Sequence, residues 1–428
     1  MQTHLETKPQ QNRSDNFHTA TQKAKKTMRL PIVPMIMWIA VTLGSGIWIF
    51  NILRKRHPQM KFARYAWLLL VAAVTALAVV MMSTPHRTGD DAALLKVNWM
   101  LFVVITFTFP QIVYLLFDLI GRLPRLFGKK RCKWSSRTGI AAAYALFAAM
   151  WWGALFNRFN IDVNEVTVEI DGLPASFDGY RIVQFSDLHT GSYGDDTSFV
   201  EKIVDAINAQ NPDAVFFTGD IVNRRSRELT PFAPYLNKIK VKDGVVSILG
   251  NHDYGDYFRW FNTDARMSNM EELTDLYREM GWRLLRNQTI WLTNGNDSIA
   301  VLGVENIGDK PFPVYGSLAR TYPDIGDEKT KILLSHNPSH WTDSISDRDD
   351  INIALTLSGH THAMQAEIAG ISPAALRYPK WGGLYKDKSG QHQLYVNIGV
   401  GTVGFPMRLG ATPEISVITL RPKGAGNE

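Results

Sequence analysis

The stretch that decides the fold is Tyr180–His189, which reads YRIVQFSDLH. It begins with a short apolar run, which is typical of a buried strand. Asp187 and His189 follow this run directly, with only Leu188 between them. Because side chains alternate between the two faces of an extended chain, this spacing predicts that the carboxylate and the imidazole share one face. A carboxylate beside an imidazole is the beginning of a metal site.

Four more units, each an apolar run followed by polar side chains, come later in the chain. Their polar residues are, in order, Asp220 after Gly219; Asn251, His252 and Asp253 after Gly250; His336 with Asn337; and His360 with His362 after Gly359. Each unit alone has a simpler explanation, since Gly-Asp is mostly a turn and a histidine after a strand is mostly a surface residue. Together they offer more ligands than one ion needs. The mixture of imidazole and carboxylate groups fits Mn, Fe or Zn, and the sequence predicts two divalent ions.

The chain beyond Asn157 alternates short apolar runs with helix-like segments, which predicts an α/β domain. We expect amphipathic helices over residues 197–210 and 269–280. Ligand sites of open α/β sheets usually follow strand ends, as the polar units do here. The predicted strands cover residues 166–170, 182–185, 214–218, 244–249, 299–304, 331–335, 353–357, 394–398 and 415–420.

The first 156 residues have a different character. Residues 1–29 are polar and basic and predict a disordered tail rather than a signal peptide. Each of the four apolar stretches that follow is near the length needed to cross a bilayer. They predict a transmembrane region over residues 30–156, with Asp118 close enough to a helix end to reach the interface. The four stretches are Leu30–Phe50, Tyr65–Met82, Trp99–Ile120 and Gly139–Phe156.

The distribution of charge predicts how the chain is oriented in the membrane. The net charge is +6, and much of the excess lies in connections between apolar stretches, so membrane topology explains it better than nucleic-acid binding. The first and third connections are rich in Lys and Arg, whereas residues 83–98 are not. The first and third connections should therefore be cytoplasmic, and the C-terminal domain non-cytoplasmic. The basic N-terminal tail argues for the opposite orientation. The single cysteine, Cys132, excludes a disulfide framework and a CxxC zinc site.

Taken in order, the five polar units resemble the motifs of the calcineurin-like metallophosphoesterases over roughly residues 178–421. The resemblance implies an α-β-β-α sandwich after the four-helix transmembrane region, with residues 157–177 as connector and first strand and 178–428 as the phosphoesterase domain. Asn397–Gly401, Pro406-x-Arg408 and Pro413-Glu414 resemble a branch of small bacterial membrane-linked or exported phosphoesterases that act on lipid-like or nucleotide-diphospho-lipid substrates. Ala363–Gln365 depart from that branch, which usually has glycines there, so this backbone is expected to be less free.

The resemblance also implies residue roles. One ion would be held by Asp187, His189 and His362, and the other by Asn251, His336 and His360, with Asp220 bridging both. A metal-activated hydroxide would hydrolyse a phosphoester, such as a phosphodiester, or a pyrophosphate. His252 would contact the phosphate or protonate the leaving oxygen, with Asp253 orienting its ring.

Further residues are candidates for contact with the substrate. The resemblance offers Asn223 and Arg408. Arg224, Arg225 and Arg227 could bind an anionic group, although a charge run is usually a solvated face. The aromatic segment 254–261 either packs on the helix at 269–280 or forms a lip for an apolar, lipid-linked group.

Two other functions compete with a membrane-anchored hydrolase. A metal-binding sensor or scaffold would keep a closed, structural site, and His252 would then have no purpose. A transporter would place ionisable residues deep in the membrane stretches, and these stretches hold none there.

Overall fold

Two β-sheets form the centre of the C-terminal part of the chain in the computed structural model, which describes residues 32–322 and 329–424. The first sheet has the strand order β1-β12-β2-β3-β4-β5. Strands β2 to β5 run parallel, so their carboxyl ends meet at one edge. The strands are β1 (Asp162–Ile170), β12 (Glu414–Pro422), β2 (Arg181–Phe185), β3 (Ala214–Phe217), β4 (Val245–Ser247) and β5 (Arg283–Leu284).

The second sheet has the order β10-β11-β9-β8-β7-β6. Its four central strands run parallel, and antiparallel strands close both edges. The strands are β10 (Gly383–Lys386), β11 (Gln393–Val396), β9 (Leu355–Ser358), β8 (Lys331–Leu334), β7 (Asp297–Gly303) and β6 (Gln288–Asn294).

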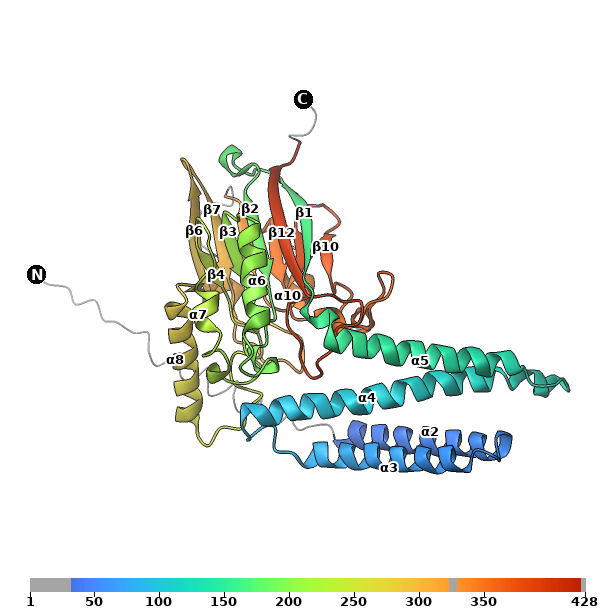
Figure 1. Cartoon of the computed structure of the whole chain (residues 1–428). Helices are drawn as coiled ribbons and strands as arrows, with labels where there is room; N and C mark the ends of the chain where they lie inside the picture. Colours follow the sequence, from blue (N-terminus) through green and yellow to red (C-terminus); the bar gives the residue numbers. More distant parts are fainter. Residues whose placement is uncertain (1–31, 323–328, 425–428) are drawn as a thin grey trace, which may run out of the picture.

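The main core lies between the two sheets. Ile182 and Phe216 of the first sheet are fully buried in one cluster with Val301 and Leu334 of the second. The alternate residues of the first sheet, such as Val183, face the helices α6 (Ser198–Ala209), α7 (Ala233–Leu236) and α8 (Thr263–Glu279). The short helices α9 (Leu318–Thr321) and α10 (Ser339–Ser344) cover the second sheet. The predicted α-β-β-α sandwich is therefore confirmed (Figure 1).

The element boundaries differ from the sequence-based prediction at several points; β1, for example, begins at Asp162 rather than at residue 166. Strands β5, β6 and β10 were not predicted, because β5 has only two residues and the other two lie at edges with few buried side chains. Helix α8 begins at Thr263, six residues before the predicted start, where Asn262 caps it by accepting from the N–H of Ala265 at 2.8 Å.

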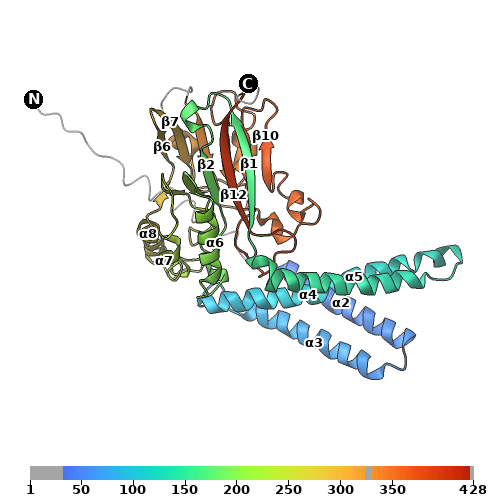
Figure 2. The same cartoon turned by 45° about the horizontal axis from the view of Figure 1, so that its top comes forward.

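Four helices precede the sandwich, and each is long and apolar enough to cross a membrane. They are α2 (Ile32–Arg56), α3 (Lys61–Ser83), α4 (Asp91–Ile120) and α5 (Lys133–Leu155). In two views they run away from one end of the sandwich (Figures 1 and 2). The tail predicted over residues 1–29 lies outside the described residues.

Helix α4 joins the membrane region to the sandwich. Its 30 residues span about 45 Å, which exceeds the ~30 Å of a hydrocarbon core. It is therefore long enough for its first turns to extend beyond a bilayer. Helix α4 contacts η4 (Thr190–Ser192), directly after His189. The loop 405–409 also packs on α4 and α5, and a side chain at Gly153 would come within 2.7 Å of the Arg408 carbonyl. The glycine thus permits a close approach between α5 and this loop.

Asp118 lies two residues before the end of α4, in agreement with its expected place near a helix end. Its side chain is fully buried among three arginines. Arg56 of α2, Arg122 after α4 and Arg131 before α5 contact its carboxylate at 2.7, 2.7 and 3.1 Å. This network holds three helices together at the end of the bundle far from the sandwich.

Candidate metal centre

The polar residues predicted from the sequence gather at the carboxyl ends of parallel strands from both sheets. Sheet edges of this kind are where α/β folds bind ligands. Asp187 and His189 follow β2, Asp220 follows β3, Asn251 and His252 follow β4, His336 follows β8, and His360 and His362 follow β9.

Many of these residues have a left-handed backbone. The φ angles are 55° at Asp187, 49° at His189, 60° at Asp220, 76° at His360 and 50° at His362. Such conformations cost about 1–3 kcal/mol each at non-glycine residues and cluster at functional sites. They also show that strand alternation is not what brings Asp187 and His189 together: both follow the end of β2, and turns aim their side chains.

The turn at Gly219–Asp220 and the turn at Gly250 approach each other so closely that both need glycine. A side chain on Gly250 would lie 2.2 Å from Oδ1 of Asp220, and one on Gly219 would lie 2.4 Å from the backbone nitrogen of Gly250. Only glycine fits at both positions, because any Cβ would displace the Asp220 carboxylate or its support. The two Gly-containing turns thus set the place of Asp220.

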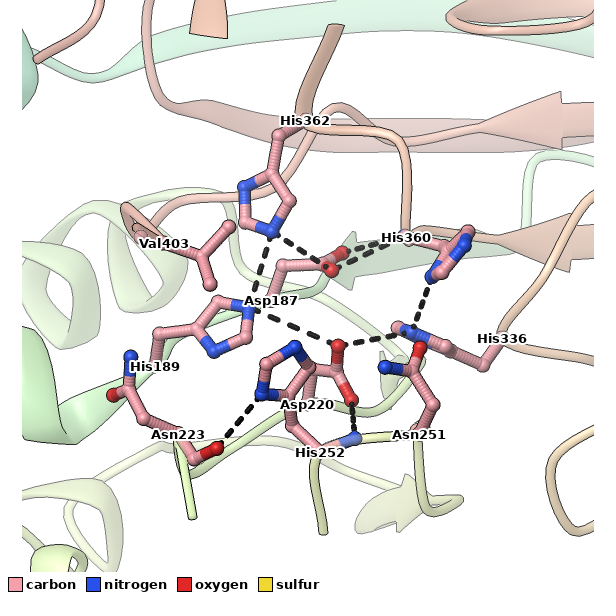
Figure 3. A network of polar contacts seen from close by, with 12 residues as sticks. Asp187, His189, Asp220, Asn223, Asn251, His252, His336, His360, His362 and Val403 are labelled. Atoms are coloured by element: carbon pink, nitrogen blue, oxygen red, sulfur yellow. Dashed lines mark hydrogen bonds and ion pairs between the residues drawn. The ribbon is translucent and has the colours of Figure 1, made fainter. Parts of the chain in front are cut away.

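Asp187, His189 and His362 form the first cluster (Figure 3). Nε2 of His362 lies 3.2 Å from Oδ1 of Asp187 and 3.1 Å from Nε2 of His189. All three side chains are almost fully buried. One carboxylate and two imidazole nitrogens therefore converge on one point.

His336, His360 and Asp220 form the second cluster. Nδ1 of His360 lies 3.3 Å from Nε2 of His336, and Nδ1 of His336 is 2.8 Å from the carbonyl of Thr218. The carbonyl fixes the His336 ring with its Nε2 toward the cluster. Asn251 lies beside them in Figure 3, and its Oδ1 is buried without a hydrogen-bond partner.

Asp220 connects the two clusters. Its Oδ2 lies 3.7 Å from Nε2 of His189 and 3.1 Å from Nε2 of His336. Its Oδ1 accepts the backbone N–H of His252 at 2.8 Å, which fixes the carboxylate plane. One oxygen of Asp220 thus faces an imidazole of each cluster. This is the position that a carboxylate bridging two ions would occupy.

The pKa values of the clustered groups favour cation binding. Burial lowers the pKa of His360 to about 3, so its ring is neutral near pH 7. Burial opposes charge on Asp220, but His336 and His252 outweigh it and hold the pKa of the Asp220 carboxyl well below its usual range. Burial likewise opposes charge on His336, yet the Asp220 carboxylate raises the pKa of His336 to about 9. A divalent cation beside Asp220 would take the place of that proton.

These residues fit divalent metal ions. Nε2 of His189 and Nε2 of His362 lie 3.1 Å apart and face two carboxylates. The buried Oδ1 of Asn251 has no hydrogen-bond donor. Neutral imidazole, carboxylate and amide oxygen together form a donor set for Mn, Fe or Zn.

His252 lies at the edge of both clusters. Its Nδ1 donates to the carbonyl of Asn223 at 2.7 Å, which leaves Nε2 as the acceptor of the neutral ring. The ring stacks on Tyr257 with centroids 4.0 Å apart. The expectation that Asp253 orients this ring is wrong: its carboxylate accepts backbone N–H groups of Asp220, Ile221, Val222 and Gly250 instead. Asp253 therefore braces the Asp220 turn.

The two candidate substrate residues have different positions. Asn223 holds His252 through its carbonyl, and its side-chain Oδ1 is buried without a partner. Arg408 is fully buried, and its guanidinium donates to the carbonyls of Gly401, Ile398 and Ala411. It therefore cannot reach a substrate, and that expectation is wrong. Nη2 of Arg408 lies 3.2 Å from Nδ1 of His362, so its role is to position the loops behind that ring.

The arginine run is not a free anion site, and of its three arginines only Arg227 is largely exposed to solvent. Arg224, Arg225 and Arg227 all pair with Asp91 at the start of α4, at 2.8, 2.8 and 3.4 Å. Arg224 also donates to the carbonyl of Asp90 at 3.1 Å. The run ties the sandwich to the membrane region.

The aromatic segment 254–261 is mostly packed within the domain. Tyr254 stacks on Tyr315, and Trp260 donates to the carbonyl of Gly255 at 2.7 Å. Of its aromatic side chains, only Phe261, at 98% exposure, projects freely. Tyr254 lies in one buried cluster with Met270 and Tyr277 of the helix predicted at 269–280, which agrees with the packing alternative for that residue.

Two tyrosines complete the site and were missed. The hydroxyl of Tyr257 accepts from Nδ2 of Asn251 at 2.9 Å, and that of Tyr378 lies 2.9 Å from Nε2 of His360. Tyr257 was indicated by the sequence, because this residue lies in the aromatic segment directly after His252. Nothing in the sequence indicated Tyr378, because only the fold brings that residue to His360.

Comparisons with known proteins agree with this geometry. A calcineurin-like phosphoesterase family model matches residues 180–364, and a model described as a probable calcineurin-like phosphoesterase transmembrane domain matches residues 28–158. An uncharacterized metallophosphoesterase of Bacillus subtilis, YkuE, is 31% identical over 297 residues, covering 66% of this chain and 94% of its own. This chain belongs to the calcineurin-like metallophosphoesterases, with a four-helix transmembrane domain before the phosphoesterase domain.

Two further matches are more distant or partial. A transmembrane protein with a metallophosphoesterase domain from Danio rerio is 31% identical over 268 residues, covering 60% of this chain and 57% of its own. Among solved structures, the phosphopantetheinyl hydrolase of Mycobacterium tuberculosis is 14% identical with a TM-score of 0.34, covering 53% of this chain and 91% of its own.

Proposed function

We propose that this chain is a membrane-anchored phosphoesterase that uses two divalent ions to hydrolyse a phosphoester or pyrophosphate of a lipid-linked substrate. The position of Asp220 between the two clusters is the observation that carries the proposal. Asp187, His189 and His362 would hold one ion, and Asn251, His336 and His360 the other. Bound there, the ions would supply Lewis acids that activate water and neutralise phosphoryl oxygens.

The protein's own groups would orient the substrate and move protons. His252 is suited to proton transfer, because Asn223 fixes Nδ1 as the donor and leaves Nε2 free to take up a proton from the attacking water and pass it to the leaving oxygen. Stacking on Tyr257 holds the ring plane. The unpartnered Oδ1 of Asn223 could accept a hydrogen bond from the substrate.

The location of the site supports a substrate in the membrane. Segments next to the site touch the membrane region: η4 contacts α4, and the backbone N–H of Arg259 donates to the carbonyl of Arg87 at 2.8 Å. Val403 lies beside the rings of His189 and His362 in Figure 3, and its loop continues onto α4 and α5. A lipid headgroup at the bilayer surface would therefore be near the ions.

The orientation of the bundle supports a non-cytoplasmic domain. The second connection, 84–90, lies at the sandwich end of the helices, whereas the basic first and third connections lie at the far end (Figure 1). Because basic connections stay in the cytoplasm, the sandwich would lie on the opposite side.

A matched pair of substrates tests the proposal. Full-length protein in mixed micelles would be given a long-chain prenyl pyrophosphate and a short-chain analogue with the same headgroup, with and without a chelator. We expect chelator-sensitive hydrolysis of both, with a higher kcat/KM for the long chain. Equal kcat/KM values would refute the lipid preference alone. If neither substrate nor any of a panel of other phosphoesters were hydrolysed, the proposed phosphoesterase activity would be refuted.

A further inference from the structure

The segment Met364–Leu376 exposes more apolar surface than is usual for a folded domain. The side chains of Ile368, Ile371 and Leu376 are 70%, 75% and 94% exposed. Met364 adds a fourth exposed apolar side chain. All four lie within 13 consecutive residues that start two positions after His362. We call this segment the apolar loop.

The sequence of the apolar loop has almost no charge. Residues 368–376 read IAGISPAAL, without a single Asp, Glu, Lys or Arg. Exposed loops in water are usually polar, and an exposed charge-free stretch marks a contact with a protein or a membrane. The cations Arg377 and Lys380 that follow have partners within the domain, since Arg377 pairs with Asp309 and Lys380 lies over the ring of Tyr385.

The apolar loop is attached to the part of the domain that rests on the membrane helices. The backbone N–H of Glu367 donates to the carbonyl of Leu409 at 2.8 Å, and that of Leu409 donates to the carbonyl of Gln365 at 2.9 Å. Leu409 in turn packs with Met407 against Phe102 of α4 and its neighbours. In both views the segment lies beside the end of α5 that joins the sandwich (Figures 1 and 2).

The backbone of the apolar loop suits an environment with little water. Ile368 and Ile371 exchange two backbone hydrogen bonds, at 3.0 and 3.1 Å, around a turn in which Ala369 and Gly370 have φ of 52° and 77°. The hydroxyl of Ser372 donates to the carbonyl of Ala363. Polar backbone groups satisfied within the segment lower the cost of leaving water.

From these four observations we propose that the apolar loop is a second membrane contact of this chain. It dips into the interfacial layer of the same bilayer that α2 to α5 span, with Ile368, Ile371 and Leu376 toward the lipid. Segments of this kind insert about 5–10 Å into the headgroup and acyl boundary. The contact would hold the turn that carries His360 and His362 at the bilayer surface. This membrane contact goes beyond the proposed hydrolysis, because it does not depend on whether the site hydrolyses a phosphoester.

Site-directed fluorescence in lipid tests the inference without using activity. Cys132→Ser removes the single, exposed cysteine and provides a background for Ile371→Cys and Leu376→Cys, each labelled with an environment-sensitive dye. Leu116→Cys on the lipid-exposed surface of α4 is the buried-in-lipid control. Ser389→Cys, in the exposed turn between β10 and β11 at the other end of the sandwich, is the aqueous control.

The labelled full-length proteins would be reconstituted into vesicles of phosphatidylcholine with and without brominated acyl chains. We expect blue-shifted emission at positions 371 and 376, with quenching by brominated lipid within about twofold of that at position 116. Emission and quenching like those at position 389 would overturn the inference. A blue shift without quenching by brominated lipid would also overturn it, because a protein surface, such as a second copy of the chain, would then cover the loop.

Discussion

Nη2 of Arg224 lies 2.8 Å from Oδ1 of Asp91, and this ion pair joins the phosphoesterase domain to the first turn of α4. Arg224 is only 3% exposed and also contacts Glu228 at 3.3 Å. It directly follows Asn223, whose carbonyl holds the ring of His252. The attachment to the membrane region is thus one residue away from the proposed proton-transfer group.

Removing this buried cation should weaken the whole protein. Arg224→Met leaves Asp91 with fewer partners and the buried Glu228 without its cation, which we expect to cost about 3 kcal/mol. The thermal unfolding temperature of the full-length protein in detergent should fall by several degrees. Arg227→Met is the matched control, because Arg227 is 64% exposed and its pair with Asp91 should contribute about 0.5 kcal/mol. Equal unfolding temperatures for the two variants would contradict the role given to Arg224.

His252→Ala should separate metal binding from turnover. We expect the metal content to stay near that of the unaltered protein while kcat falls about 100-fold or more, the scale for loss of a general acid or base. Metal analysis and kinetics on the same sample check both. Loss of metal together with activity would instead make His252 a ligand.

The orientation in the membrane can be read with fusion reporters. A reporter that is active only outside the cytoplasm should be active when fused after Glu428, and inactive when inserted in the third connection, near Lys129. The basis is the concentration of Lys and Arg in the first and third connections. The opposite pattern would reverse the topology and place the phosphoesterase domain in the cytoplasm.

His340 should make the domain sensitive to acid. Burial lowers the pKa of His340 to about 4 in the folded protein, against a usual value near 6.5. The unfolded state therefore binds the proton first, so stability present above pH 6.5 is lost as the pH falls toward 4. His340→Gln should show a smaller fall in unfolding temperature between pH 7 and pH 5 than the unaltered protein, with metal removed from both. Parallel pH profiles would show that His340 does not contribute.

The long-range organisation of the chain could be predicted from its sequence, because it depends on long apolar stretches and on repeated strand-end motifs. Four apolar stretches marked the membrane helices. The glycines before Asp220, Asn251 and His360 marked strand ends, and the structure brings all seven proposed ligands together.

The finer contacts could not be predicted, because they depend on which segments the fold places side by side. Arg408 is aimed at backbone carbonyls, and Asp253 at the N–H groups of the Asp220 turn, rather than at a substrate or an imidazole. The departure at Ala363–Gln365 was visible, but not that all three residues have positive φ, at 50°, 46° and 58°. Nor does a run of arginines reveal that its partner, Asp91, lies in a membrane helix more than a hundred residues earlier.

The most direct test of two ions sharing one carboxylate is to remove that carboxylate. Asp220→Ala and the control Asp275→Ala, which changes an exposed residue of α8, would be purified as full-length proteins. Metal content and phosphoesterase activity would then be measured on each. We expect about two divalent ions per chain and full activity in the control, and loss of both metal and activity in Asp220→Ala. Full metal content with full activity in Asp220→Ala would contradict the dinuclear centre.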